Sequence, residues 1–310
     1  MTIGDLGEFS LISELMAFFS QGENVFLGPG DDAAVVRVPQ GHVVMSTDML
    51  VEGRHFRRDW SSAEDIGHRA AAESLSDINA MGGTAHAITV ALGAPPDLPT
   101  QWALDFARGL ADECALVGAS VVGGDLTRSD AVVIAITAIG AVRTAPIVRG
   151  GAKPGDILAL CGRQGWAAGG LAILSRGFRS PRALVEAYQR PCPPYEAGPQ
   201  AAQVGATSLI DISDGLVAEA THLAEASGVA IDIHADAFDI AEPLQAVAAA
   251  MGTDPLALIL GGGDDHALLA TFPPDASLPE GWRAIGAVGE GEGVSVDGAP
   301  YDGVAGYTHF

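Results

Sequence analysis

The chain has 310 residues, a length that suggests about two domains, and 48% of its residues are hydrophobic. Intrinsic disorder is therefore excluded, because a disordered acidic chain lacks the apolar side chains that fill a core. The 39 Asp and Glu residues outnumber the 16 Lys and Arg residues and give a formal net charge of −23. Nucleic acids and anionic membranes are therefore not expected partners, because both would be repelled.

The first half of the chain alternates irregularly between helical and strand patterns. Apolar spacing predicts a helix over residues 8–19 and a strand over 42–45 that runs into Ser46-Thr47-Asp48. We expect the next helix to be capped by Ser62 and to end before Gly82. A strand at 85–92, a helix at 100–117 capped by Thr100, a short strand at 119–122 and a strand at 131–142 complete this half. This order favours an α+β fold over a doubly wound sheet.

A cluster of helix and strand breakers at residues 144–155 separates this half from the next. It marks the best domain boundary, with one domain over residues 1–148 and another over 149–310. The second half is predicted to contain strands at 156–160, 209–212 and 229–233 and helices at 167–176, 181–189 and 216–226.

The cysteines and the N-terminus both indicate a soluble, cytoplasmic protein. Cys114, Cys161 and Cys192 are sparse and odd in number, which argues against a disulfide framework or a zinc ribbon. The first 19 residues carry only acidic charges and do not resemble a signal peptide. The longest clean apolar run, residues 131–142, is too short to cross a bilayer.

Several aspartates stand where one predicted element ends or another begins. They are Asp31, Asp32, Asp48, Asp77, Asp125, Asp211 and Asp214. Any single one is more often a turn former or a solvated surface residue. As a set they favour a site for Mg²⁺, which takes oxygen ligands and bridges carboxylates to substrate phosphates.

Common phosphate and hydrolase motifs are missing. The only lysine is Lys153, so a P-loop is excluded, and a strand-like run after Gly28-Pro29-Gly30 excludes the dinucleotide fingerprint. The segment 211–215 is not an EF-hand loop, because its glycine falls at the fifth position instead of the sixth. Neither G-x-S-x-G nor H-E-x-x-H occurs in the sequence.

Seven motifs follow one another along nearly the whole chain. They are GEFSLI at 7–12, GPGDDA at 28–33, STDMLVEGRHF at 46–56, LSDINAMG at 75–82, GGDLTR at 123–128, RGGAKPGD at 149–156 and DISDGL at 211–216. Each is weak alone, but the ordered set resembles the thiamine-monophosphate kinase family. The resemblance implies ATP-dependent phosphorylation of thiamine phosphate to thiamine diphosphate with several Mg²⁺ ions. It also implies the two-domain α+β fold of aminoimidazole ribonucleotide synthetase and selenophosphate synthetase, with the N-terminal domain forming a homodimer.

Matching the motifs residue by residue implies a binding site. The implied Mg²⁺ ligands are Asp32, Ser46, Thr47, Asp48, Asp77, Asp125, Asp211 and Asp214, and the implied ATP contacts are Gly124, Asp125, Arg149 and Ser213. His55, Asp264 and Tyr307 would lie on the thiamine phosphate side. Asp264 stands where the family has a glutamate, and Val304 stands where it often has an aromatic side chain, which Tyr307 could replace. His266 and the other histidines are interpreted as structural.

The implied chemistry agrees with the residue types. ATP and a phosphomonoester are polyanions, so a carboxylate-lined site can bring them together only if cations reverse its charge. Arg149 can supply a forked donor to phosphate. The site contains no Ser–His or Cys–His pair, so we expect direct transfer with no residue acting as a covalent nucleophile.

Two alternatives remain at this point. One is another ATP-using enzyme of the same superfamily, similar to aminoimidazole ribonucleotide synthetase. The other is a non-catalytic protein that binds divalent cations. Selenophosphate synthetase is disfavoured, because the first cysteine is Cys114 and no lysine precedes Lys153.

Overall fold

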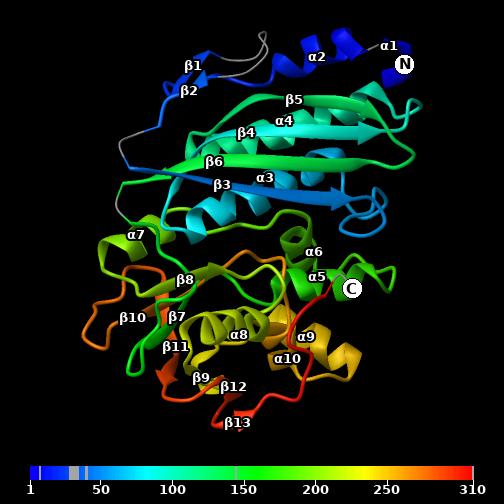
Figure 1. Cartoon of the computed structure of the whole chain (residues 1–310). Helices are drawn as coiled ribbons and strands as arrows, with labels where there is room; N and C mark the ends of the chain where they lie inside the picture. The colour runs from blue at the N-terminus through cyan, green and yellow to red at the C-terminus, as the bar shows by residue number, and fades with distance from the viewer. Residues whose placement is uncertain (7, 28–34, 39–40, 144, 309–310) are drawn as a thin grey trace. The chain divides into compact units, whose positions relative to one another are not determined.

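The computed structural model describes residues 1–6, 8–27, 35–38, 41–143 and 145–308. The chain divides into two compact units. The first comprises Met1–Ile78 and Gly83–Ala145, and the second comprises Asn79–Gly82 and Pro146–Phe310. Both units combine helices with a mainly antiparallel sheet, so the predicted α+β class is confirmed (Figure 1).

A four-stranded sheet organises the first unit. Its strand order is β3 (His42–Val51), β6 (Val133–Val142), β4 (Thr84–Ala94) and β5 (Ser120–Arg128). The β4–β5 pair is parallel and the other two pairs are antiparallel. Helices α3 (Ala63–Ala80) and α4 (Thr100–Val117) lie along one face of this sheet (Figure 1). Shorter elements precede it: α1 (Ile3–Leu6), α2 (Glu8–Met16), β1 (Val25–Leu27) and β2 (Val35–Val36).

The ends of the two long helices test the predicted caps. The Ser62 Oγ accepts a hydrogen bond from the Asp65 N–H at 3.2 Å, and an Asp65 Oδ accepts one from the Ser62 N–H at 3.0 Å. This reciprocal cap confirms the predicted start of α3. The predicted cap of α4 was wrong: Pro99 occupies the N-cap, and Thr100 lies inside the first turn with a buried side chain.

Strands β3 and β5 extend further than predicted, so Asp48 and Asp125 lie within strands and not at their ends. Pairing with β6 carries β3 on to Val51, and pairing with β4 carries β5 on to Arg128. These partners are remote in the sequence, which is why local patterns stopped both strands early. Within a strand, side chains alternate between the two faces of the sheet, and this decides where each aspartate points.

The face of the sheet opposite α3 and α4 carries exposed apolar side chains. Val43, Met45 and Met49 alternate along β3 and are 52%, 63% and 57% exposed. Leu50, on the helix-covered face, is completely buried. The first unit therefore presents a partly apolar sheet face to its surroundings.

A seven-stranded sheet organises the second unit. Its order is β13 (Ala299–Pro300), β12 (Gly293–Val296), β9 (Ala230–Ile233), β11 (Trp282–Gly289), β7 (Ile157–Cys161), β10 (Leu268–Phe272) and β8 (Ser208–Asp211). The helices are α5 (Trp166–Leu174), α6 (Arg182–Gln189), α7 (Ala197–Gln203), α8 (Leu216–Ser227), α9 (Glu242–Met251) and α10 (Pro255–Leu260), with a 3₁₀ turn at Ala235–Ala237. Every residue of β10 is buried, and Phe272 packs edge-on against Trp282 in the core. Among the described residues, no helix has both the length and the apolar character needed to cross a membrane.

Candidate functional site

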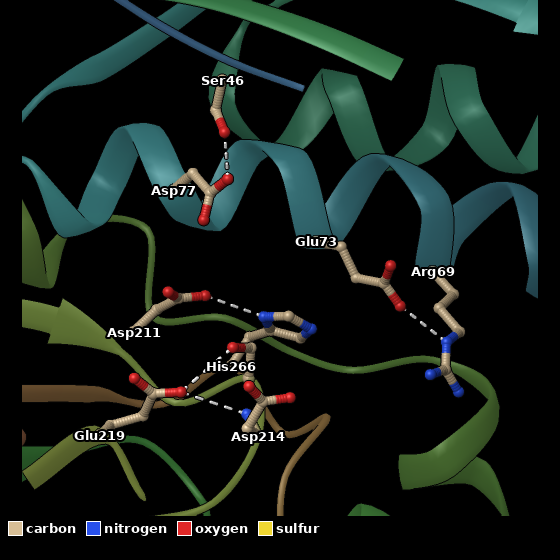
Figure 2. A network of polar contacts seen from close by, with 9 residues as sticks. Ser46, Arg69, Glu73, Asp77, Asp211, Asp214, Glu219 and His266 are labelled. Atoms are coloured by element: carbon tan, nitrogen blue, oxygen red, sulfur yellow. Dashed lines mark hydrogen bonds and ion pairs between the residues drawn. The ribbon is translucent and has the colours of Figure 1, made fainter. Parts of the chain in front are cut away.

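In the first unit, β3 and α3 bring hydroxyl and carboxylate oxygens together. The Ser46 Oγ on β3 donates a hydrogen bond to an Asp77 carboxylate oxygen on α3 (Figure 2). Asp48 projects from the same face of β3 as Ser46, two residues along, and its Oδ2 is buried. Glu73 lies one turn before Asp77 on α3 and accepts a hydrogen bond from the Arg69 Nε at 2.8 Å. Hard oxygen donors of this kind suit Mg²⁺.

The side chain of Thr47 lies on the other face of β3. Its Oγ1 is 2.8 Å from the Thr137 Oγ1 of β6, in an exposed cross-strand pair. The structure therefore does not bring this hydroxyl together with Ser46 and Asp48, although the three residues are adjacent in the sequence.

Asp125 is also separated from Asp48. When the strand pairing is followed from β3 through β6 and β4 to β5, Asp125 lies level with Met49, and Asp48 lies level with Gly124. Asp125 therefore points to the partly apolar face of the sheet, and Asp48 points to the opposite face. Two strands lie between β3 and β5, so the backbones at Asp48 and Asp125 are about 14 Å apart. These two carboxylates cannot share one ion.

The packing of β5 against β4 explains why residue 124 is a glycine, in addition to its implied contact with ATP. A Cβ at this position would lie 1.9 Å from the Val90 carbonyl oxygen of β4. Only glycine allows the parallel strands to approach in this way.

His55 lies in the turn that follows β3. Its Nδ1 accepts a hydrogen bond from the Val51 N–H at 2.9 Å, so the neutral ring carries its proton on Nε2. The same turn is held by Glu52, whose carboxylate accepts from the Arg58 Nε at 2.5 Å and the Val132 N–H at 3.3 Å. The histidine is thus fixed in one tautomer and offers an N–H donor.

In the second unit, the end of β8, two loops and the last segment of the chain bring five predicted site residues together. Asp211 is the last residue of β8, and the first loop, which joins β8 to α8, carries Ser213 and Asp214. The second, residues 261–267, precedes β10, and its Asp264 N–H donates to the Ser213 carbonyl at 2.8 Å. A Cβ on Gly263 would lie 2.0 Å from that carbonyl oxygen, so this close approach requires glycine. The last segment of the chain joins them through the Tyr307 N–H, which donates to the Asp214 carbonyl at 3.1 Å.

Two titratable residues of this site, Glu219 and Asp265, were missed by the sequence analysis, and a third, His266, was interpreted only as structural. The first is Glu219 on α8. Its Oε1 lies 3.3 Å from both the Ser213 Oγ and the Asp214 N–H, which donate to it (Figure 2). Burial, assisted by the negative charges of Asp211 and Asp214, raises the pKa of Glu219 to about 7. An acidic residue in the first turn after DISDG was the available signal.

The other missed residue, Asp265, follows Asp264 and is itself followed by His266. The Asp265 Oδ1 accepts the Ala167 N–H at 3.0 Å at the start of α5, and burial raises the pKa of this carboxyl to about 7. The His266 Nδ1 lies 2.9 Å from the Asp211 Oδ2 (Figure 2). The sequence shows them only as the polar run Asp264-Asp265-His266 and contains no sign of their partners.

Arg149 and Asp32 complete the predicted set. The Arg149 carbonyl accepts a hydrogen bond from the Ser227 Oγ at 3.1 Å. Arg149 is exposed, and the positive charge of its guanidinium lowers the pKa of Glu219, which partly offsets the rise caused by burial. Asp32 and the rest of GPGDDA lie outside the described residues.

The charges in the second unit indicate that the site suits a cation. Asp211, Asp214 and Glu219 crowd together closely enough for the two aspartates to disfavour ionisation of the glutamate. A divalent cation would relieve this repulsion, and the carboxylate donors present are those that Mg²⁺ prefers.

Comparisons with known proteins show which family the chain belongs to. The model of the AIR synthase related protein, N-terminal domain, matches residues 30–142. The thiamine-monophosphate kinase of Mycobacterium tuberculosis H37Rv is 45% identical over 100% of this chain and 93% of its own length. The solved thiamine-monophosphate kinase of Stenotrophomonas maltophilia has a TM-score of 0.83 at 30% identity and covers 95% of this chain and 98% of its own.

A further solved structure, described as AaThiL complexed with AMPPCP and TMP, has a TM-score of 0.83 at 32% identity. It covers 100% of this chain and 99% of its own. Similarity at this level extends over both units and far exceeds what a shared fold alone requires. The chain therefore belongs to the thiamine-monophosphate kinase family of phosphotransferases.

Proposed function

We propose that this chain transfers the γ-phosphoryl group of ATP directly to thiamine phosphate, which yields thiamine diphosphate and ADP. The observation that carries the proposal is the convergence of Asp211, Ser213, Asp214, Asp264 and Tyr307 on two adjoining loops and the end of the chain. Support also comes from the family and from the similar structure described as a complex with AMPPCP and TMP.

Each unit, taken by itself, offers carboxylates that would hold Mg²⁺. In the first unit, Ser46, Asp48 and Asp77 form one candidate ligand group, and Asp125 would serve a different ion because of its separation from Asp48. In the second unit, Asp211 and Asp214 would be ligands. Bound there, Mg²⁺ would neutralise phosphate charge and stabilise the charge that develops during transfer.

The remaining residues would orient the two substrates. Arg149 offers a planar guanidinium with several donors to the ATP phosphates, and the Ser213 hydroxyl and the backbone around Gly124 would contribute further contacts. On the acceptor side, His55 supplies its Nε2–H, while Asp264 supplies a carboxylate. Tyr307 is 55% exposed and is the aromatic side chain we assign to the thiamine rings, since Val304 is not aromatic.

Transfer needs no enzyme nucleophile. The acceptor is a phosphate oxygen that is already ionised at neutral pH; it forms the new bond to the γ-phosphorus as the bond to the β–γ bridging oxygen breaks, and ADP leaves with that electron pair. Alignment of the phosphates supplies much of the lowered barrier.

A turnover assay with ATP and thiamine phosphate tests the activity, and ATP with a chiral γ-phosphorus tests the route. We expect thiamine diphosphate with inverted configuration at phosphorus and no exchange of label between ATP and ADP without thiamine phosphate. Net retention of configuration at the γ-phosphorus would indicate a phosphorylated enzyme intermediate and contradict direct transfer. Absence of turnover with retained Mg²⁺ binding would favour a non-catalytic cation-binding protein, and turnover of an aminoimidazole precursor would favour the related synthetase.

The apolar sheet face of the first unit supports a homodimer. Val43, Met45 and Met49 form a surface on which a second copy would bury apolar area. Met45→Lys should convert the dimer to a monomer in sedimentation equilibrium. Leu116→Lys, at an equally exposed apolar residue of α4, should not change the mass. A wild-type monomer at micromolar concentration would contradict the proposal.

We also assign the enzyme to the reducing cytoplasm. All three cysteines, each in the described part of the chain, carry free thiols, and Cys192 is exposed. An exposed thiol is compatible with a reducing compartment.

A further inference from the structure

We propose that His266 is a positioning residue that orients the carboxylate of Asp211 toward the divalent cation. The inference rests on the proposed function, because Asp211 is a metal ligand only within that proposal. The histidine would not touch substrate; it would act through the aspartate.

The first observation is a buried pair of polar side chains. The His266 Nδ1 lies 2.9 Å from the Asp211 Oδ2, and the two side chains are only 5% and 7% exposed. An ionised carboxylate accepts hydrogen bonds and cannot donate them, so Nδ1 carries the proton in this contact. With little water to compete, a charge-assisted hydrogen bond of this kind holds the carboxylate in one orientation.

The second observation is that the backbone presents the ring to Asp211 despite an unfavourable conformation. His266 has a φ of +52°, in the left-handed region, which costs a residue with a Cβ about 1 kcal/mol. Hydrogen bonds between the same two segments maintain it: the His266 N–H donates to the Ile212 carbonyl at 3.2 Å, and the Ile212 N–H donates to the Ala267 carbonyl at 2.8 Å. The segment that carries the aspartate therefore also holds the histidine.

The third observation is where Asp211 stands. It is the last residue of β8, where it pairs with Leu268 of β10, and the chain turns directly into the loop that carries Ser213 and Asp214. With the backbone held by β10 and Oδ2 held by the histidine, the orientation of Oδ1 is determined by the rigid carboxylate plane. In metal sites, hydrogen bonds of this type orient the ligands, and their loss weakens metal binding about 10-fold to 100-fold.

Three substitutions at His266 distinguish a role in orienting the Asp211 carboxylate from a role in packing alone. His266→Asn keeps an N–H donor near the place of Nδ1 and tolerates the left-handed backbone. His266→Leu has nearly the same shape as asparagine but no donor. His266→Gly also removes the donor and relieves the backbone strain, so it provides a folded variant if the leucine variant is destabilised.

The measurement is binding of Mn²⁺ to the full chain in the presence of AMPPCP, followed by electron paramagnetic resonance. His266→Leu and His266→Gly should weaken one class of Mn²⁺ sites about 10-fold to 100-fold, while His266→Asn should stay within about threefold of wild type. Adding His266→Leu to Asp211→Asn should cause no further weakening, because the histidine acts through the aspartate.

Unchanged Mn²⁺ affinity in folded His266→Leu or His266→Gly would overturn the inference, as would an additive effect in the double variant. Either result would still be compatible with the proposed kinase function, provided that the wild type phosphorylates thiamine phosphate. A wild type without turnover would instead contradict the proposed function, and the Mn²⁺ measurements would still report on the pair.

Discussion

The two units hold their acidic side chains in different ways. In the first unit, Asp48 and Asp125 project from regular strands and Asp77 from a helix, and Asp125 is exposed. In the second unit, Asp211 and Asp265 lie in or beside loops and are buried, with partners supplied by other segments. Charge is expensive to bury, so the second unit depends on its partners for stability as well as for geometry. Substitution of the exposed Asp125 should therefore affect activity alone, whereas substitution of a buried carboxylate in the second unit should also change stability.

The largest expected effect is on activity, in the first unit. Asp125→Asn should lower kcat about 10³-fold, because it removes an anionic ligand from an ion that stabilises transferring phosphate. The free energy of unfolding should change by less than about 0.5 kcal/mol, since the side chain is exposed. Turnover at saturating Mg²⁺ and urea denaturation test both statements, with the exposed Asp130→Asn as control. Near-wild-type turnover would remove Asp125 from the site.

The next effect is on stability, in the second unit. Burial raises the pKa of Asp265 from 3.8 to about 7, so the folded state holds this proton more tightly than the unfolded state. Its contribution to stability is fully present below pH 3.8 and is lost as the pH rises to about 7, a change of about 4 kcal/mol.

The measurement compares Asp265→Asn with wild type by urea denaturation without divalent cations. Asparagine keeps the oxygen that accepts the Ala167 N–H, so the two proteins should be similar near pH 4 and the variant more stable above pH 7. The exposed Glu290→Gln should show no such divergence. Parallel pH profiles for Asp265→Asn and wild type would show that this carboxyl is not buried as described.

A smaller effect should distinguish the acceptor side from the nucleotide side. His55→Asn keeps an acceptor for the Val51 N–H but loses the Nε2–H, and Asp264→Asn removes one charge at a left-handed residue that asparagine tolerates. Each should raise the KM for thiamine phosphate about tenfold, the effect of one lost hydrogen bond to a charged group, with little change for ATP. A rise confined to the KM for ATP would move these residues to the nucleotide side.

The smallest effect concerns the two faces of β3. Thr47→Val removes the hydrogen bond to Thr137 and should lower stability by about 1 kcal/mol or less, with turnover within about twofold of wild type. The matched Ser46→Ala, on the opposite face, should reduce turnover far more. Equal losses of turnover in the two variants would return the Thr47 hydroxyl to the candidate ligands.

Local features were predictable because the residues that produce them are close in the sequence. The Ser62–Asp65 cap of α3 and its end at Gly82 are set within one turn of the chain. The extents of β3 and β5 were not predictable in the same way, because pairing with β6 and β4 lengthens both strands beyond their local patterns. Only the strand register places Asp48 and Asp125 on opposite faces.

The order of the motifs was sufficient to identify the family and to name the acidic residues, since motif identity is a property of neighbouring residues. Tertiary structure decided which of these residues can act together. It separates the Thr47 hydroxyl from Ser46 and supplies Asp211 with His266, a partner 55 residues away in the chain. Such partners leave no pattern in the sequence, because they meet only when a loop packs against the end of a distant strand. The pairing is needed there because a buried carboxylate requires a hydrogen-bond donor.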